Sequence, residues 1–253
     1  MFTANHQTYG QSVLKLFKPG AADRVDRELE AVARVRSPNI PAVFETGTIS
    51  SPTGPLVWLT EQWIEGTTLS ALIGTRPFSG QEILHIADGL LTAAVAAEKA
   101  HVVHRDIKPA NVLIDTAGDA WLLDFGIARL LDMDSKTRTD ARYGPHSPGY
   151  GAPEQFRNRK AEIAGRTDLF AIGVLLYEVT TGQNPFLNGA RDRPEILNRV
   201  ETMPLPRLDL SWDPSRGFSD FVAALTQKQP YRRPRTCQDA YDWLHELMAD
   251  LGG

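Results

Sequence analysis

The sequence has 253 residues, of which 42% are hydrophobic and 23% are charged, as in a typical soluble globular protein. Its net charge of -4 argues against a protein that binds nucleic acid or an anionic membrane through bulk positive charge. A single cysteine, Cys237, excludes a disulfide framework and a cysteine-based zinc site, and it favours a reducing, cytoplasmic setting.

The N-terminal segment is predicted to contain short strands around one helix. Residues 12–17 form a compact apolar run that ends just before Pro19-Gly20, which is the pattern of a buried strand and its turn. From Asp23 to Arg36, apolar residues recur at helical spacing. Pro38 ends this helix, because the residue before a proline is pushed out of the helical region.

The next segment predicts a hairpin, because apolar runs at 40–44 and 56–60 flank the turn-rich residues 46–55. After Trp63 the patterns become helical. The predicted helices are 80–100, 167–181, 194–201, 218–227 and 236–251. No apolar stretch is long enough to span a bilayer, and the start of the chain lacks the apolar core of a signal peptide.

The segment from His104 to Asn111, with the sequence HRDIKPAN, carries the strongest chemical signal. Phosphoryl transfer needs a carboxylate to orient and deprotonate the attacking hydroxyl, and cations to spread the charge on the moving group. Asp106 could supply the carboxylate and Lys108 a cation. The amide oxygen of Asn111 could bind Mg2+, a hard cation that prefers oxygen ligands. A polar loop with a capping aspartate would not explain why these residues occur together.

A second signal is Asp124-Phe125-Gly126, which follows an apolar run and lies 18 residues after Asp106. The glycine allows a sharp turn of the backbone. Alone, this triplet is a common turn. Next to Asn111, the Asp124 carboxylate would complete a divalent-metal site.

Together these residues resemble the catalytic loop and metal-binding triplet of protein kinases, specifically the eukaryotic-like Ser/Thr type found in bacteria. Ala152-Pro153-Glu154 resembles the family's third signature, with Glu154 lying 28 residues after Gly126. The resemblance implies an α+β, bilobal fold with a β-rich N-lobe at 1–62 and a larger helical C-lobe at 63–253. It also implies ATP and Mg2+ as cofactors and a protein as substrate.

Two further positions resemble the family's structural residues. Asp168 occupies the start of a buried helix, where the resemblance implies that it holds the backbone of the catalytic loop. Arg233, in the segment PYRRP, resembles the arginine that pairs with the glutamate of Ala-Pro-Glu. We therefore expect a buried ion pair between Arg233 and Glu154.

The nucleotide-binding residues match less closely. Lys15 resembles the lysine that grips the α- and β-phosphates, and Glu28 lies where the family places the helix glutamate that pairs with it. Taken separately, a lysine at a strand edge and a solvated helix glutamate are equally ordinary. The spacing of Glu28, nine residues before Ser37, favours the ion pair.

Residues 58–66 resemble the strand and hinge that contact adenine. Under this resemblance, Thr60 guards the back pocket and the backbone groups of Glu61 and Trp63 bind the base. Leu113 would form the floor beneath it.

Two details favour Ser/Thr kinases over tyrosine kinases. Lys108 stands two positions after Asp106, and Ser147 resembles the hydroxyl residue that bridges this aspartate and lysine. An ordinary turn serine before Pro148 is the alternative for Ser147.

Regulation by phosphorylation is also implied. Arg105 precedes the catalytic aspartate, and in such kinases a phosphate on the activation segment pairs with this arginine. The candidate sites are Ser135, Thr137 and Thr139, most of all the two threonines, and autophosphorylation is expected. An unmodified loop is the alternative.

One departure concerns the glycine-rich nucleotide loop, which has no counterpart before Lys15, where only Gly10 occurs. Met1 falls where the family's second strand begins, so we expect weakened ATP binding and an exposed sheet edge. That edge could take a homodimer partner or a strand from another protein. Both a trimmed chain and a naturally minimal kinase fit. Val13, where the family has a small alanine, could narrow the adenine pocket.

The main hypothesis is an active Ser/Thr protein kinase, since the catalytic and metal-binding residues are intact. A kinase-fold scaffold that works by binding a partner is the alternative, based on the missing loop and Val13. A small-molecule phosphotransferase shares the aspartate and asparagine logic but does not predict Ala152-Pro153-Glu154.

Overall fold

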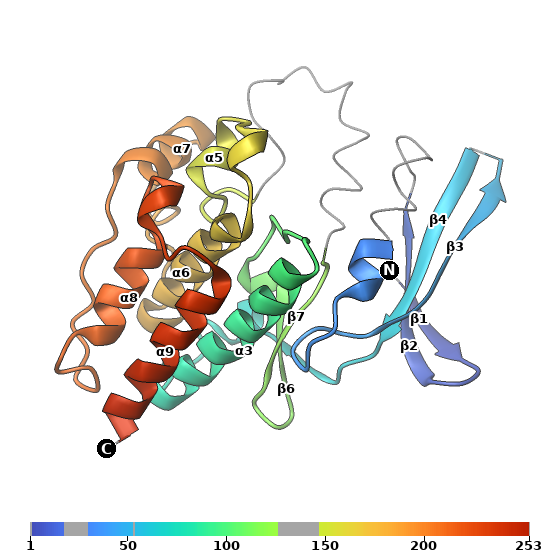
Figure 1. Ribbon diagram of the computed structural model, residues 1–253, viewed down its shortest axis with the longest axis horizontal. Coiled ribbons are helices and arrows are strands. Elements are labelled where there is room, and N and C mark those ends of the chain that lie inside the picture. The colour runs from blue at the N-terminus through green and yellow to red at the C-terminus, as the bar shows by residue number, and fades with distance from the viewer. Residues whose placement is uncertain (1, 18–29, 53, 126–146, 253) are drawn as a thin grey trace.

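The computed structural model describes residues 2–17, 30–52, 54–125 and 147–252. The chain forms two lobes, a β-sheet at one end and a larger group of helices at the other (Figure 1). This arrangement confirms the α+β, bilobal fold. Among the described residues, no helix has the length and apolar character needed to cross a membrane.

The N-lobe sheet has four antiparallel strands in the order β1-β2-β4-β3. Their bounds are β1 Phe2–His6, β2 Gly10–Phe17, β3 Val43–Ser51 and β4 Gly54–Gln62. The predicted hairpin is present as β3 and β4, but the turn is shorter than expected. Residues 46–51 continue β3, because they pair in register with 54–59 and gain ladder hydrogen bonds that a long turn would lose.

The predicted N-lobe helix is described only in part, and residues 30–34 of it are helical. The C-lobe begins with a small sheet of order β5-β6-β7, formed by Gly66–Thr68, Val112–Asp115 and Ala120–Leu122. Gly66 allows β5 to lie close against its antiparallel neighbour β6, since a Cβ there would collide with the carbonyl oxygen of Ile114.

The C-lobe helices agree closely with the sequence pattern. Their bounds are α2 Leu69–Leu72, α3 Gly80–Lys99, α5 Pro153–Phe156, α6 Gly165–Thr181, α7 Arg193–Thr202, α8 Gly217–Leu225 and α9 Cys237–Gly252. Short 3-10 turns occur at Pro109–Asn111, Lys160–Glu162 and Pro230–Arg232.

Local chemistry explains where α3 begins. The Ser79 hydroxyl accepts a bond from the Glu82 amide at 3.2 Å, and the Glu82 carboxylate accepts one from the Ser79 amide at 2.8 Å. This reciprocal pair satisfies amides that have no partner inside the helix. It sets the start of the helix that packs against α6.

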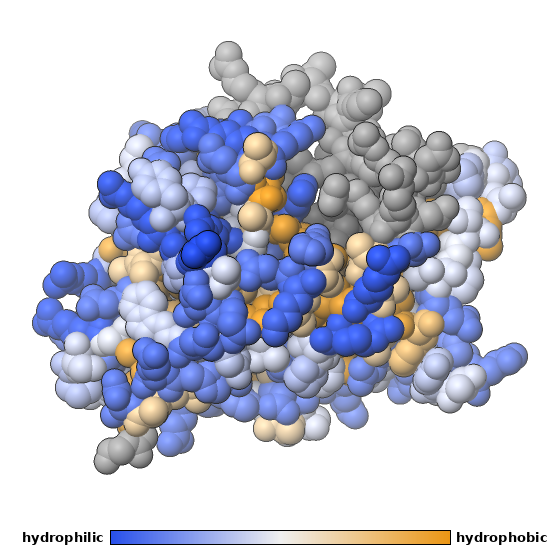
Figure 2. Space-filling model, viewed as in Figure 1, coloured by the Kyte–Doolittle hydropathy of each residue, from blue (hydrophilic) through white to orange (hydrophobic). Residues whose placement is uncertain are grey.

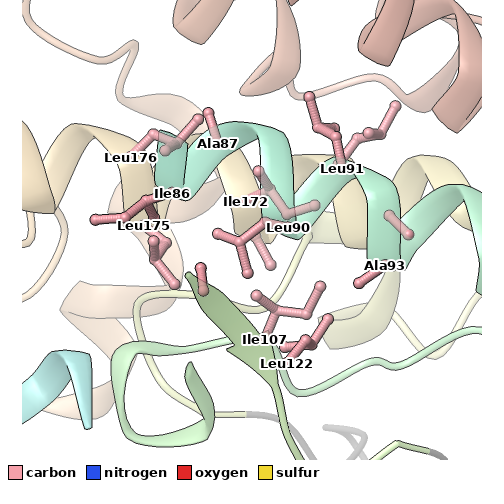
Figure 3. Close-up of a cluster of buried hydrophobic side chains, with 14 of the residues drawn as sticks. Ile86, Ala87, Leu90, Leu91, Ala93, Ile107, Leu122, Ile172, Leu175 and Leu176 are labelled. Atoms are coloured by element: carbon pink, nitrogen blue, oxygen red, sulfur yellow. The ribbon is translucent and has the colours of Figure 1, made fainter. Parts of the chain in front are cut away.

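The core lies between α3 and α6. Leu90 of α3 and Ile172 and Leu175 of α6 are completely buried, and Figure 3 shows Leu90 and Ile172 next to each other above Ile107 and Leu122. Ile107 belongs to the segment HRDIKPAN, so the catalytic loop is anchored to the core by one of its own residues. The outer face in Figure 2 is mainly hydrophilic, with smaller apolar areas between.

Candidate active site

The loop that carries Asp106 is held by Asp168, in the first turn of α6. The Asp168 carboxylate accepts hydrogen bonds from the backbone amides of His104 at 2.8 Å and Arg105 at 2.9 Å. Burial raises the pKa of the Asp168 carboxyl, against the opposing effects of His104 and the two amide donors. The expected contact between Asp168 and the loop backbone is therefore present.

His104 connects this loop to the residues before Asp124. Its Nδ1 accepts a bond from the Asp106 amide at 3.2 Å, and its Nε2 lies 2.7 Å from the carbonyl oxygen of Leu123. These partners assign the proton to Nε2, which donates to Leu123. The ring also meets Phe125 edge-on, with centroids 4.6 Å apart. The two sequence motifs are thus joined through one imidazole.

The Asp106 carboxylate lies in a network with Lys108 and Ser147. Lys108 Nζ is 2.7 Å from Asp106 Oδ2 and donates to the Ser147 hydroxyl at 2.8 Å. Ser147 in turn donates to Asp106 Oδ1 at 2.6 Å. Ser147 therefore bridges the aspartate and the lysine, in the geometry that the resemblance implied.

Strained backbone occurs beside both motifs. Arg105 has φ +69° and Asp124 has φ +63°, in the left-handed region that non-glycine residues rarely adopt. Such conformations persist only where the surrounding contacts determine them, and they are concentrated at functional sites. Two hydrogen bonds supply such contacts for Arg105. Its backbone N–H donates to the Asp168 carboxylate, and its carbonyl oxygen accepts from Gln155 Nε2 at 2.8 Å.

Asn111 and Asp124 have the right chemistry for Mg2+. The Asn111 amide nitrogen donates to the Asp106 carbonyl at 2.8 Å and carboxylate at 3.2 Å, so its oxygen is the atom left to take a cation. The Leu123 amide donates to the Asn111 backbone carbonyl at 2.8 Å. Asp124 is the residue after Leu123, so this bond holds the two candidate metal ligands in neighbouring segments. Among the described residues no group of three or more His, Cys, Asp or Glu could hold a metal. A smaller oxygen set fits Mg2+, which retains waters and shares substrate phosphates.

Lys15 of β2 reaches the C-lobe motifs. Its Nζ lies 2.7 Å from Asp124 Oδ1 and also forms an ion pair with Glu61 of β4. The Lys15 side chain is only 5% exposed. Its expected partner, Glu28, lies outside the described residues.

Thr60 and Glu61 face opposite sides of the sheet. Strand side chains alternate, and the register pairs Glu61 with Val13 and Thr60 with Leu14. Glu61 therefore shares its face with Lys15, which contacts Asp124, so this face is the interlobe face. The Thr60 hydroxyl is buried on the other face and has no hydrogen-bond partner among the described residues. The structure thus places Thr60 on the face away from Lys15, which differs from the expectation that Thr60 guards the back pocket.

The Glu61 side chain was not predicted as part of the site. Desolvation by burial raises the pKa of its carboxyl, although the Lys15 charge lowers it. The Glu61 backbone lies in a central strand, with Val13 on one neighbouring strand and Val43 on the other. Its backbone N–H and C=O groups therefore face these neighbouring strands. Side chains two apart on a strand share a face, so Lys15 shares one with Val13 and with Glu61 opposite it. This rule would have predicted Glu61 as a site residue if the strand register had been known.

The connection between the lobes follows β4. Trp63 is 40% exposed and stands outside the strand, whose last residue is Gln62. Leu113 lies on β6, opposite Thr68 of β5 and Trp121 of β7. Contact of Trp63 or Leu113 with a base stays a prediction.

The expected ion pair between Arg233 and Glu154 is present and fully buried. The guanidinium bonds both carboxylate oxygens, at 2.7 and 3.0 Å, and both side chains are 0% exposed. The next residue, Gln155, donates to the Arg105 carbonyl, so the segment that carries Glu154 also contacts the catalytic loop. Of the predicted regulatory residues, Ser135, Thr137 and Thr139 lie outside the described residues.

Comparison with known proteins agrees with this geometry. The protein kinase domain family matches residues 5–244. The chain is 31% identical over 235 residues to the serine/threonine-protein kinase PknB of Mycobacterium leprae, covering 90% of this chain and 35% of the relative. It is 35% identical over 232 residues to the probable serine/threonine-protein kinase PknB of Lactococcus lactis, covering 91% and 34%.

The chain spans about a third of the length of the curated relatives it matches. The family match, by contrast, extends over nearly the whole chain and includes both lobes. The chain belongs to the protein kinase domain family.

Proposed function

We propose that this chain is a Ser/Thr protein kinase catalytic domain that transfers the γ-phosphate of ATP to hydroxyl groups of proteins in the cytoplasm. The observation that carries the proposal is the network in which Lys108 and Ser147 hold the Asp106 carboxylate. This network supports a role for Asp106 as a general base that is held in position to accept the proton of a substrate hydroxyl. The names of the PknB relatives support the same class of substrate.

In this mechanism, Asp106 orients the substrate hydroxyl and accepts its proton. A bond forms between the hydroxyl oxygen and the γ-phosphorus, and the bond from that phosphorus to the β–γ bridging oxygen breaks, releasing ADP. Lys108, held 2.7 Å from Asp106, would stabilise charge on the transferring phosphoryl group. The Ser147 hydroxyl keeps the aspartate and lysine in register.

The other residues would hold the nucleotide. Asn111 and Asp124 would bind Mg2+, which when bound neutralises phosphate charge. Lys15 would bind the phosphates, and the connection after β4 would meet the base. We also propose that the domain phosphorylates its own activation segment at Ser135, Thr137 or Thr139. Phosphopeptide mass spectrometry after incubation with Mg-ATP tests this; absence of phosphate from residues 132–142 contradicts it.

Labelled ATP with Mg2+ and a generic acceptor protein tests the main proposal. Asp106→Asn keeps the size of the side chain but removes the base, so transfer should fall by about 10²-fold or more. Asp209→Asn is the matched control, because Asp209 is exposed in a C-lobe loop, and it should transfer normally.

Acid hydrolysis of the product identifies the acceptor. Phosphoserine or phosphothreonine supports the proposal, and phosphotyrosine alone contradicts the assigned specificity. Equal transfer by wild type and Asp106→Asn contradicts the role of Asp106. No transfer and no ATP binding by the wild type would favour the alternative function, a kinase-fold scaffold.

A further inference from the structure

The ammonium of Lys15 is held between carboxylates from two lobes. Glu61 belongs to β4 of the N-lobe sheet, and Asp124 follows β7 in the C-lobe. Both contacts are ion pairs to the same nitrogen, which is itself buried. The two carboxylates differ in how firmly they are placed, and this difference suggests different roles.

Glu61 is the firmly placed partner. It lies in a central strand with neighbours on both sides, and its side chain is 12% exposed. Asp124 lies outside the strands, in a left-handed conformation, and its side chain is 40% exposed. Asp124 is therefore the partner that can exchange Lys15 for another ligand, while Glu61 remains in contact.

A buried ammonium needs a permanent partner. Removing one member of a buried ion pair leaves an uncompensated charge, which is strongly unfavourable. If Asp124 were the only carboxylate on Lys15, turning it toward a metal would leave the lysine unpaired. With Glu61 present, Lys15 stays compensated and positioned when Asp124 leaves.

We infer that Glu61 is a positioning residue, the resident anchor that keeps Lys15 at the interlobe face while its bond to Asp124 is exchanged during nucleotide binding. The inference rests on the proposed nucleotide site. It assigns to a sheet residue a task that the sequence resemblance gave to Glu28. An ammonium has three donors, so Lys15 can keep its contact with Glu61 and still offer donors to a phosphate after Asp124 has left.

Equilibrium binding tests this without turnover. The probes are the non-hydrolysable analogue AMP-PNP with Mg2+, and adenosine, which has no phosphates. Glu61→Gln should weaken AMP-PNP binding about tenfold, which corresponds to ~1.4 kcal/mol. It should leave adenosine binding within about twofold, because Lys15 acts only on phosphates.

The matched control is Thr60→Val, the neighbouring buried residue on the opposite face, which should bind both ligands normally. A Lys15→Met background provides the second control. If Glu61 acts through Lys15, Glu61→Gln should cause no further loss there. Glu61→Asp keeps the charge and should recover part of the affinity, and thermal unfolding of each variant checks that it is folded.

Several outcomes would overturn the inference. These are unchanged AMP-PNP binding by Glu61→Gln, an equal loss for adenosine, the same loss in the Lys15→Met background, or a larger loss in Glu28→Gln than in Glu61→Gln. If the wild type bound neither ligand, the proposed function itself would fail, which is a distinct result.

Discussion

The buried pair between Arg233 and Glu154 should be essential to the stability of the C-lobe. Glu154→Gln preserves the shape of the side chain but removes its charge. It also places an amide donor against one N–H of the guanidinium. Breaking a buried ion pair in this way typically costs about 3–5 kcal/mol, because the remaining charge is uncompensated.

The structure indicates which end of that range applies. Arg233 also donates to the carbonyl oxygens of Arg166 at 2.8 Å and Gln227 at 2.8 Å, and it lies 4.9 Å from the Phe170 ring. These contacts would partly compensate the guanidinium in the variant. We therefore expect a loss of about 3 kcal/mol, a large share of the 5–15 kcal/mol by which domains are stable.

Equilibrium unfolding in urea measures this loss. With an m-value of about 3 kcal/mol/M, the midpoint should fall by about 1 M, provided that fluorescence and circular dichroism give coincident transitions. The control is Glu201→Gln, which breaks the half-exposed pair between Arg157 and Glu201 and should cost less than about 1 kcal/mol.

A double variant separates charge from packing. Glu154→Met combined with Arg233→Met removes both charges, so it should be more stable than either single methionine variant. The reasoning is refuted if Glu154→Gln loses no more stability than Glu201→Gln.

Three further predictions concern stability and reactivity. Burial raises the pKa of the Cys237 thiol, so a disulfide reagent should label it only upon unfolding; labelling of the native protein at the rate of free cysteine would contradict this. Burial over Phe186 lowers the pKa of Lys228 to about 8 from 10.5. The buried charge is unfavourable below pH 8, so the Lys228 contribution to stability should increase between pH 8 and 10.5. In urea titrations, the free energy of unfolding of the wild type should therefore rise relative to that of Lys228→Met over this range, and a constant difference between the two would contradict the assignment. The bond to Arg76 and the Ser79 cap lower the pKa of Glu82 to about 2 from 4.5. Its stabilisation is complete above pH 4.5 and is lost as the pH falls toward 2, while Ser79→Ala should cost about 1 kcal/mol in thermal or urea unfolding at pH 7; an unchanged midpoint would argue against the cap.

The catalytic loop and the C-lobe helices could be predicted because their signals are local. His104 to Asn111 lie in one short segment, so their spacing alone brings an aspartate, a lysine and an asparagine together. The helix bounds followed from apolar spacing, and the Ser79 cap seen in the structure is a signal of the same local kind, because it acts within one turn. The resemblance extended this to distant pairs, including Arg233 with Glu154.

The side-chain faces of the N-lobe sheet could not be predicted in the same way. A shift of one residue along a strand moves a side chain to the opposite face. An error of one residue in the predicted strand pairing therefore decides whether Thr60 or Glu61 is assigned to the face of Lys15. Only the pairing of β2 with β4 decides which of them meets Lys15. The chemistry of the catalytic segment can be read from the order of its residues, because neighbours in the chain stay neighbours in space. The tertiary structure alone decided that Glu61 joins it, because strand register depends on residues far apart in the chain.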